Sequence, residues 1–280
     1  MLTPASELRF FTQADGYRTA ARVWETTSPT ATIVFLHGIV SHGGWYVETC
    51  RALATADIDV HFLDRRGSGL NLPERGDVDS WTTWLADVER YLTRLPQPVY
   101  LLGVSWGGKL AAAIARRRPD LIAGVGLICP GLFAKQQPGP LRRTFIRFAA
   151  MRTRLSRRRV TIPLADTALF ADTETWQDFV RNDPLALRQI TLRFAREDLE
   201  LTNYAVGKPA AVSTPALLVL AGRDRIVENE PTSTWFQQLR SEDRTVIEYP
   251  TAPHTLEFAA GSPTYVGDLI EWVKTRSARR

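Results

Sequence analysis

The stretch that decides the fold is Gly103-Val104-Ser105-Trp106-Gly107, a G-x-S-x-G sequence. A short apolar run at residues 98–102 precedes it, and an alanine-rich, helix-forming run at residues 109–115 follows it. A strand that turns into a helix at G-x-S-x-G is typical of a nucleophile elbow, and a side chain at either glycine would collide with a neighbouring element. We therefore predict that Ser105 is an exposed nucleophile at a helix N-terminus. The alternative is an ordinary strand–loop–helix turn.

Strands and helices alternate at both ends of the chain. Besides the run before Ser105, we expect strands at residues 32–36, 58–63, 123–128, 215–222 and 245–249, and an N-terminal hairpin around Asp15-Gly16. This alternation predicts an α/β fold with a mostly parallel, doubly wound sheet covered on both faces. The alternation fails in the middle of the chain. We therefore assign residues 1–130 and 210–280 to the core, and residues 131–209 to a mostly helical lid inserted into it.

The composition is that of a globular protein, with 44% hydrophobic and 23% charged residues. Cys50 and Cys129 show no C-x-x-C spacing, so we expect neither a disulfide framework nor a metal site, and a reducing compartment. We see no signal-peptide pattern and no apolar run of membrane-spanning length, and we expect a cytoplasmic protein. A formal net charge of +5 is too small to argue for nucleic acid.

Serine is a poor nucleophile without an adjacent base. Because ligands of open α/β sheets bind at the carboxyl ends of the strands, the base and its acid should each follow a strand. Of the four histidines, only His254 follows Ser105 in the chain, as the order Ser–acid–His at such an elbow requires. Asp224 lies two positions after residues 215–222, whereas the fallback Asp243 precedes a strand. We therefore predict that His254 is the general base and that Asp224 fixes its tautomer.

The tetrahedral intermediate of acyl transfer needs N–H donors. We expect one from the backbone of Trp106, directly after the serine, and the other from Ile39, because Gly38 lets its loop approach closely. His37 and Gly38 are expected beside the substrate, although His37-Gly38 could also form a plain tight turn. In the lid, Phe133 and Phe170 are candidate substrate contacts or, equally, lid core.

With these residues the chain resembles the α/β-hydrolase family, and within it the branch of monoacylglycerol lipases, lysophospholipases and serine aminopeptidases. The resemblance rests on Leu36-His37-Gly38, Asp64-Arg65-Arg66-Gly67-Ser68-Gly69, the elbow, residues 222–227 and His254. It implies hydrolysis more strongly than any one substrate, and it implies that residues 131–209 are a lid over the serine. The loop after His37 lacks the Gly-Gly-Gly run of the hormone-sensitive-lipase type. A serine at the elbow, rather than an aspartate, argues against haloalkane dehalogenases and epoxide hydrolases.

We therefore predict a serine hydrolase that cleaves carboxylic esters, such as monoacylglycerols or lysophospholipids, through an acyl-enzyme on Ser105 and without a cofactor. The same triad would serve an amide or peptide hydrolase or an acyltransferase. A peptidase would need a lid carboxylate for a free amino terminus, and the lid offers Asp172, Glu174, Asp178 and Glu197. A ligand receptor with little turnover is the alternative from another class, which an intact triad disfavours.

A run of arginines without any acidic residue marks the lid between Leu141 and Val160. It comprises Arg142, Arg143, Arg147, Arg152, Arg154, Arg157, Arg158 and Arg159, with Phe145 and Phe148 interleaved. One interpretation is a solvated helix whose apolar stripe packs on the core. The other is transient contact with an anionic membrane surface or an acidic substrate. We expect no nucleic-acid partner, and the sequence leaves the oligomeric state open.

Overall fold

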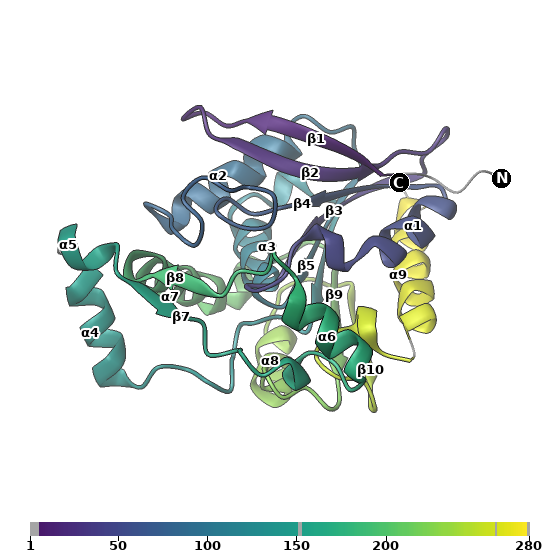
Figure 1. Cartoon of the computed structure of the whole chain (residues 1–280). Coiled ribbons are helices and arrows are strands. Elements are labelled where there is room, and N and C mark those ends of the chain that lie inside the picture. Colours follow the sequence, from purple (N-terminus) through teal and green to yellow (C-terminus); the bar gives the residue numbers. More distant parts are fainter. Residues whose placement is uncertain (1–5, 151–152, 261, 279–280) are drawn as a thin grey trace.

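An eight-stranded sheet forms the core of the computed structural model, which describes residues 6–150, 153–260 and 262–278. The strands follow the order β1-β2-β4-β3-β5-β6-β9-β10 (Figure 1). They are β1 (Glu7–Thr12), β2 (Arg18–Trp24), β3 (Ala31–Leu36), β4 (Ile58–Leu63), β5 (Val99–Val104), β6 (Gly124–Ile128), β9 (Ala216–Ala221) and β10 (Arg244–Tyr249). From β4 to β10 all neighbours pair in parallel, while β2 pairs antiparallel with β4 and with β1. The predicted mostly parallel sheet is confirmed.

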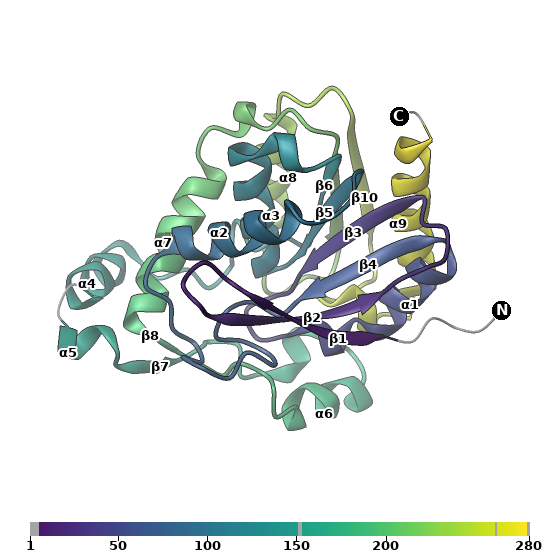
Figure 2. The ribbon, with the colours of Figure 1, turned by 90° about the horizontal axis from the view of Figure 1, so that it is seen from above.

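Helices cover both faces of this sheet (Figure 2). The core helices are α1 (Val47–Thr55), α2 (Trp81–Leu92), α3 (Trp106–Arg117), α8 (Asn229–Gln237) and α9 (Ser262–Ser277). On one face α1 packs against α9, and on the other α2 packs against α3. Strands β3, β5, β6 and β9 are buried along their whole length, which explains why they are continuous apolar runs without alternation.

Helix α2 illustrates how the sequence specifies one element. Ser80 caps it by accepting a hydrogen bond from the N–H of Thr82 at 3.2 Å. Its buried residues recur at helical spacing and form the stripe that faces the core; they are Trp84, Leu85, Val88, Tyr91 and Leu92.

Between β6 and β9 lies the cap segment, residues 131–209. It contains α4 (Pro140–Ala150), α5 (Thr153–Ser156), α6 (Glu174–Asn182) and α7 (Leu192–Val206), with an antiparallel pair of strands, β7 (Arg159–Thr161) and β8 (Gln189–Thr191). Helix α7 packs on α3, and α4 packs on α7, so that α4 and α5 lie at one end of the molecule (Figure 1). Most of its regular structure is helical. The strand pair was not predicted, because three residues are too few to show a strand periodicity.

Short 3₁₀ turns complete the described elements, at Gly43–Trp45, Pro119–Leu121, Thr167–Leu169, Pro209–Ala211 and Leu256–Phe258. None of the helices in the described part of the chain combines the length and the apolar character needed to cross a membrane.

The elbow between β5 and α3 has the strained backbone that its sequence predicts. Ser105 has a φ of 52°, in the left-handed region that residues other than glycine rarely adopt. A Cβ on Gly103 would lie 2.3 Å from the carbonyl oxygen of Gly107, and one on Gly107 would lie 2.2 Å from that of Leu36. Both glycines are therefore required by close contact with backbone.

We expect Gly107→Ala to reduce the free energy of unfolding by about 3 kcal/mol or more, because the Leu36 backbone cannot move without distorting the sheet. Gly139→Ala is a matched control, since nothing lies within 4 Å of a Cβ placed there. It should change stability by less than about 0.5 kcal/mol. Urea denaturation measures both variants, and equal stability of the two would contradict the steric explanation.

Candidate active site

Three predicted residues from three different strand ends meet at one edge of the sheet. Ser105 follows β5, Asp224 follows β9, and His254 follows β10. His254 Nε2 lies 2.9 Å from Ser105 Oγ, and His254 Nδ1 lies 2.7 Å from Asp224 Oδ2. Because a carboxylate only accepts, Nδ1 carries the imidazole proton, and Nε2 is left free to accept the proton of the Ser105 hydroxyl.

Asp224 is held in its ionised form. Burial alone would raise its pKa, but the imidazole of His254 and the backbone N–H groups of Val227 and Ile226 outweigh burial and hold the pKa below its usual range. These N–H groups donate to Oδ1 at 2.9 and 2.7 Å. The carboxylate can therefore fix the His254 tautomer and stabilise its charged form. The fallback Asp243 instead pairs with Arg276, away from the serine.

Two backbone N–H groups beside Ser105 lack an acceptor. Within the described part of the chain, the N–H groups of Ile39 and Trp106 donate to no protein oxygen. The Trp106 N–H belongs to the first turn of α3, where helix donors are free. A Cβ on Gly38 would lie 3.3 Å from Ser105 Cβ, so the loop that carries Ile39 touches the elbow. This is an arrangement that can bind an oxyanion.

His37 lies behind this loop and does not face Ser105. Its Nδ1 donates to the carbonyl of Gly38 at 2.6 Å, and its Nε2 accepts from the N–H of Arg65 at 2.8 Å. Burial, together with the charge of Arg65, holds its pKa well below the usual range, so the ring is neutral. His37 therefore holds the loop, whereas Gly38 lines a small hollow with Ser105, Phe170 and His254.

A chamber of about 380 Å³ opens between the core and the cap segment, with Ser105 in its wall. Most of its lining is apolar and includes Ile39, Ile146, Ile162, Leu164, Leu192 and Val227. The cap residues among these were not predicted. Ile146 lies on α4, Ile162 and Leu164 lie in a loop, and Leu192 is the first residue of α7. None of them belongs to a distinctive motif, so the sequence carried no signal for them.

The two predicted cap phenylalanines lie in different places. Phe170 packs near His254, with ring centroids 6.3 Å apart. Phe133 lines a separate hollow with Pro231 and Trp235, because its carbonyl accepts a hydrogen bond from the N–H of Glu228 and holds this part of the chain beside α8. The structure therefore does not bring Phe133 to Ser105, and its position does not support a substrate contact.

The carboxylates that a peptidase would need lie outside the chamber. Asp172 pairs with Arg223, Glu174 and Asp178 pair with Arg181, and Glu197 accepts from the N–H of Trp81. The carboxylate that does line the chamber is Asp198 of α7. Its Oδ1 accepts from Trp106 Nε1 at 2.6 Å and from Lys109 Nζ at 2.7 Å, so its charge is already paired.

One cluster of metal-ligating atoms occurs in the described residues. Cys129, Asp224 and His254 have these atoms within 4.8 Å of one another. Burial, together with the charge of Asp224, raises the pKa of the Cys129 thiol well above its usual value, so the sulfur stays protonated. Because Asp224 and His254 are hydrogen-bonded to each other, these two residues fit a base and the carboxylate that orients it better than a metal centre.

The cap segment is tied to the core next to the loop that carries Ile39. Asp183, after α6, accepts from Trp45 Nε1 at 2.6 Å and from His42 Nε2 at 2.9 Å. Burial opposes ionisation, but these two bonds and the charge of His42 lower the pKa of Asp183 to about 2. The N–H of Leu187 also donates to the carbonyl of Val40. Polar contacts therefore fix this part of the cap beside the serine.

Comparison with known proteins confirms the resemblance predicted from the sequence. The family model described as Hydrolase_4, serine aminopeptidase, S33, matches residues 27–259. Human monoglyceride lipase is 28% identical over 98% of this chain and 93% of its own length. Phospholipase YtpA of Bacillus subtilis is 25% identical over 83% of this chain and 91% of its own. The crystal structure of Paleococcus ferrophilus monoacylglycerol lipase, 22% identical, matches with a TM-score of 0.84 over 92% of this chain and 99% of that one.

A buried acid lies three residues after His254. Glu257 accepts a hydrogen bond from the N–H of Thr49 at 3.2 Å, and its other oxygen contacts the Thr49 hydroxyl. Burial raises the pKa of Glu257 to about 7; the bonds from Thr49 reduce this rise, and the charge of Glu48 adds to it.

We expect Glu257→Gln to remove a pH dependence of stability. Between pH 4.5 and about 7, the folded chain holds a proton that the unfolded chain has lost, so the free energy of unfolding falls as the pH rises. The fall is about 3 kcal/mol when complete. Glutamine cannot ionise, so the variant should gain Tm over the parent at about pH 8 and little at about pH 5. An equal difference at both values would contradict this explanation.

Proposed function

The chain belongs to the serine aminopeptidase S33 family of α/β-hydrolases, and we propose that it is a serine-dependent hydrolase of carboxylic esters. It is a lipase- or esterase-like member that resembles monoglyceride lipases. The observation that carries the proposal is the hydrogen-bonded series Asp224–His254–Ser105, which lies in the wall of an apolar chamber.

In the proposed reaction, Ser105 Oγ attacks the ester carbonyl carbon while His254 Nε2 takes the hydroxyl proton. The N–H groups of Ile39 and Trp106 bind the oxyanion that forms. The intermediate then expels the alcohol, which takes its proton from His254, and leaves an acyl group on Ser105. A water molecule, deprotonated by His254, releases the carboxylic acid and restores the serine. Asp224 stabilises the imidazolium in both steps.

The chamber supports an ester with an apolar acyl chain as the substrate. Its lining is mostly apolar, which suits an alkyl chain, and monoacylglycerols and lysophospholipids have one such chain. Asp198, the carboxylate in its wall, is already paired with Lys109. Among the described residues, the chamber therefore offers no free carboxylate to hold a peptide amino terminus, and this favours ester over peptide hydrolysis.

We also propose that the cap segment is a lid whose outer face contacts an anionic membrane surface. Helix α4 turns Ile146, Ala149 and Ala150 inward, as expected for a stripe that packs on the protein. Large apolar side chains elsewhere on α4 and on α5 are exposed: Leu141 (87%), Phe145 (62%), Phe148 (67%) and Leu155 (37%), of which Phe145 also borders the chamber. We call these four residues the apolar patch.

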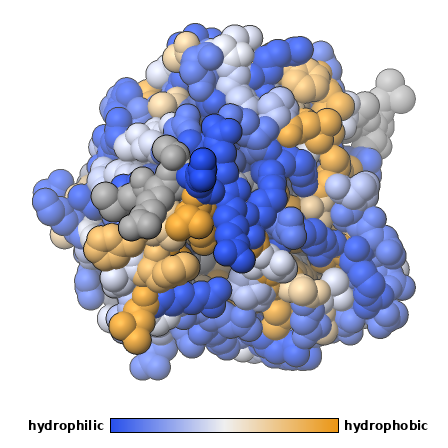
Figure 3. All heavy atoms as spheres, turned by 60° about the vertical axis from the view of Figure 1, so that its left-hand side comes forward, coloured by the Kyte–Doolittle hydropathy of each residue, from blue (hydrophilic) through white to orange (hydrophobic). Residues whose placement is uncertain are grey.

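Arginines surround the apolar patch, and Figure 3 shows hydrophobic and hydrophilic side chains side by side on this face. Exposed arginines here are Arg142, Arg147, Arg154, Arg157, Arg158 and Arg159, while Arg152 lies outside the described residues. Within the described part of the chain, Arg147 is the member of this group that forms an ion pair, with Glu200 at 3.1 Å. Unpaired arginines around apolar side chains suit a negatively charged lipid surface.

We expect Ser105→Ala to abolish labelling by a fluorophosphonate probe and to lower kcat on p-nitrophenyl esters by roughly five to six orders of magnitude. Ser28→Ala, on an exposed loop, is the matched control and should label like the parent. A series of esters of graded acyl length would separate a lipase from a short-chain esterase. If Ser105→Ala kept its activity, the proposed function would be wrong.

We expect flotation with vesicles of phosphatidylcholine and phosphatidylglycerol to recover the protein at least about tenfold better than vesicles of phosphatidylcholine alone, because each interfacial arginine contributes about 1 kcal/mol. The double variant Leu141→Ser/Phe148→Ser, at two exposed positions that do not line the chamber, should lose most of this binding. Val246→Ser, at an exposed position on β10, is the control. Equal binding to both vesicle types would contradict the membrane proposal.

A further inference from the structure

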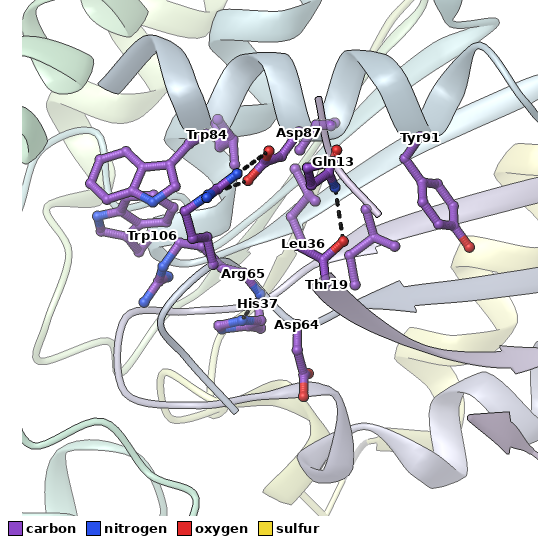
Figure 4. Close-up of a pocket in the computed structure, with 14 residues that line it drawn as sticks. Gln13, Thr19, Leu36, His37, Asp64, Arg65, Trp84, Asp87, Tyr91 and Trp106 are labelled. Carbon is purple, nitrogen blue, oxygen red and sulfur yellow. Dashed lines mark hydrogen bonds and ion pairs between the residues drawn. The ribbon is translucent and has the colours of Figure 1, made fainter. Parts of the chain in front are cut away.

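Arg65 brings a charge into the protein directly behind the loop that carries Ile39. It follows β4, and it is only 8% exposed. Its guanidinium lies over the indole ring of Trp106, 4.3 Å from the centroid, and 5.5 Å from that of Phe194. In Figure 4, Arg65 and His37 lie next to each other on the wall of a cavity of about 30 Å³, with Trp106 beside them. The charge therefore touches both segments that supply the candidate oxyanion donors.

The donors of this guanidinium are directed at loop carbonyls. Nη2 donates to the carbonyl of Ile39 at 3.2 Å and to the hydroxyl of Ser68 at 3.0 Å. Nη1 makes a longer contact, 3.4 Å, with the carbonyl of Gly38. That carbonyl also accepts from His37 Nδ1, and His37 is itself held by the backbone N–H of Arg65. Residue 65 thus binds the loop through its side chain and, by way of His37, through its backbone.

The burial of this charge is costly and is not offset by an ion pair. Among the described residues, no carboxylate lies within ion-pair distance of Arg65, and its Nε has no acceptor. The adjacent Arg66 is equally buried, but it pairs with Asp15 at 2.7 Å and with Asp87 at 2.9 Å. Because a buried unpaired charge destabilises a fold, an apolar side chain would fill the position of Arg65 at lower cost. Stability therefore does not explain the guanidinium.

Peptide geometry connects these contacts to the reaction. The group between Gly38 and Ile39 is planar and trans, so its N–H points opposite to its C=O. The C=O is fixed by His37 Nδ1 and Arg65 Nη1, and this fixes the direction of the Ile39 N–H, which donates to no protein oxygen in the described part of the chain. Donors that are already in place when the oxyanion forms need no reorganisation at that moment.

We propose that Arg65 is a positioning residue that holds the Gly38–Ile39 peptide and the Trp106 ring so that the Ile39 and Trp106 N–H groups converge on the oxyanion. The proposal rests on the proposed function, because it takes these two groups as the oxyanion donors. Arg65 is not among the described residues that line the chamber. Its effect should therefore appear in transition-state binding and leave ground-state binding nearly unchanged.

The test compares Arg65→Met with the parent chain. Methionine keeps an unbranched apolar stem against Trp106 but removes the charge and all donors. We expect kcat on p-nitrophenyl butyrate to fall about 10- to 100-fold, less than the full loss of an oxyanion donor, with KM within about threefold. The affinity for an alkyl boronic acid, which mimics the tetrahedral intermediate, should fall by the same factor as kcat/KM. A merely structural role would not produce this split.

Arg66→Met is the matched control, since it removes an equally buried arginine that does not contact the loop. It should lower the Tm and leave kcat within about twofold. Arg65→Lys keeps the charge and is the variant to measure if Arg65→Met does not fold. One ammonium cannot bond both carbonyls while it stays over the Trp106 ring, so kcat should still fall about 3- to 10-fold.

An unchanged kcat in a folded Arg65→Met, or in Arg65→Lys where Arg65→Met does not fold, would overturn the proposal, as would equal losses in the Arg65 and Arg66 variants. These outcomes differ from failure of the proposed function, in which the parent chain itself would neither react with a fluorophosphonate nor hydrolyse the ester.

Discussion

The left-handed backbone of Ser105 is the constraint on which the rest of the site depends. It reverses the chain between β5 and α3 within one residue, and this is feasible only because glycines stand on both sides of the turn. The turn directs Oγ towards His254 and leaves the N–H of Trp106 free at the start of the helix. Because Gly107 has no side chain, α3 can also approach the end of β3 at Leu36. The candidate nucleophile and its surroundings thus follow from one strained residue and the space around it.

Residues next to long regular elements could be predicted from the sequence. Continuous apolar strands and amphipathic helices have strong patterns. A polar residue shortly after a strand therefore has a definite place at the end of the sheet, which is how Ser105, Asp224 and His254 were predicted to lie together. The cap segment has no long buried strand whose end would fix the position of the residues that follow it. Glu197 and Asp198 are adjacent on α7, yet only Asp198 lines the chamber, because the packing of α7 on α3 sets its rotation. The position of Phe133 could not be predicted for the same reason, because a contact with a distant segment fixes it.

The cap segment is attached to the core unevenly. Polar links to the core come from many parts of the cap, among them Asp183 after α6, Thr191 of β8 bonded to Asp77, and Asp198 of α7. In contrast, α4 and α5 pack mainly on α7, and the ion pair of Arg147 is with another cap residue. The part of the cap that carries the apolar patch is thus the part least tied to the triad. A substrate that entered beneath α4 would leave the loop around Ile39 in place.

The pairing of β3 with β5 sets the distance between the start of the loop that carries Ile39 and the start of the elbow that carries Ser105. Leu36 and Gly103 are paired residues of neighbouring parallel strands, so the loop with Ile39 and the elbow with Ser105 both begin from this one pair. Their separation at the start is the spacing of a sheet, about 4.8 Å, and depends on backbone hydrogen bonds alone. Side chains that line the chamber can therefore vary without changing the separation between the loop and the elbow. Such a scaffold allows substrate preference to diverge during evolution while the reacting groups keep their distances.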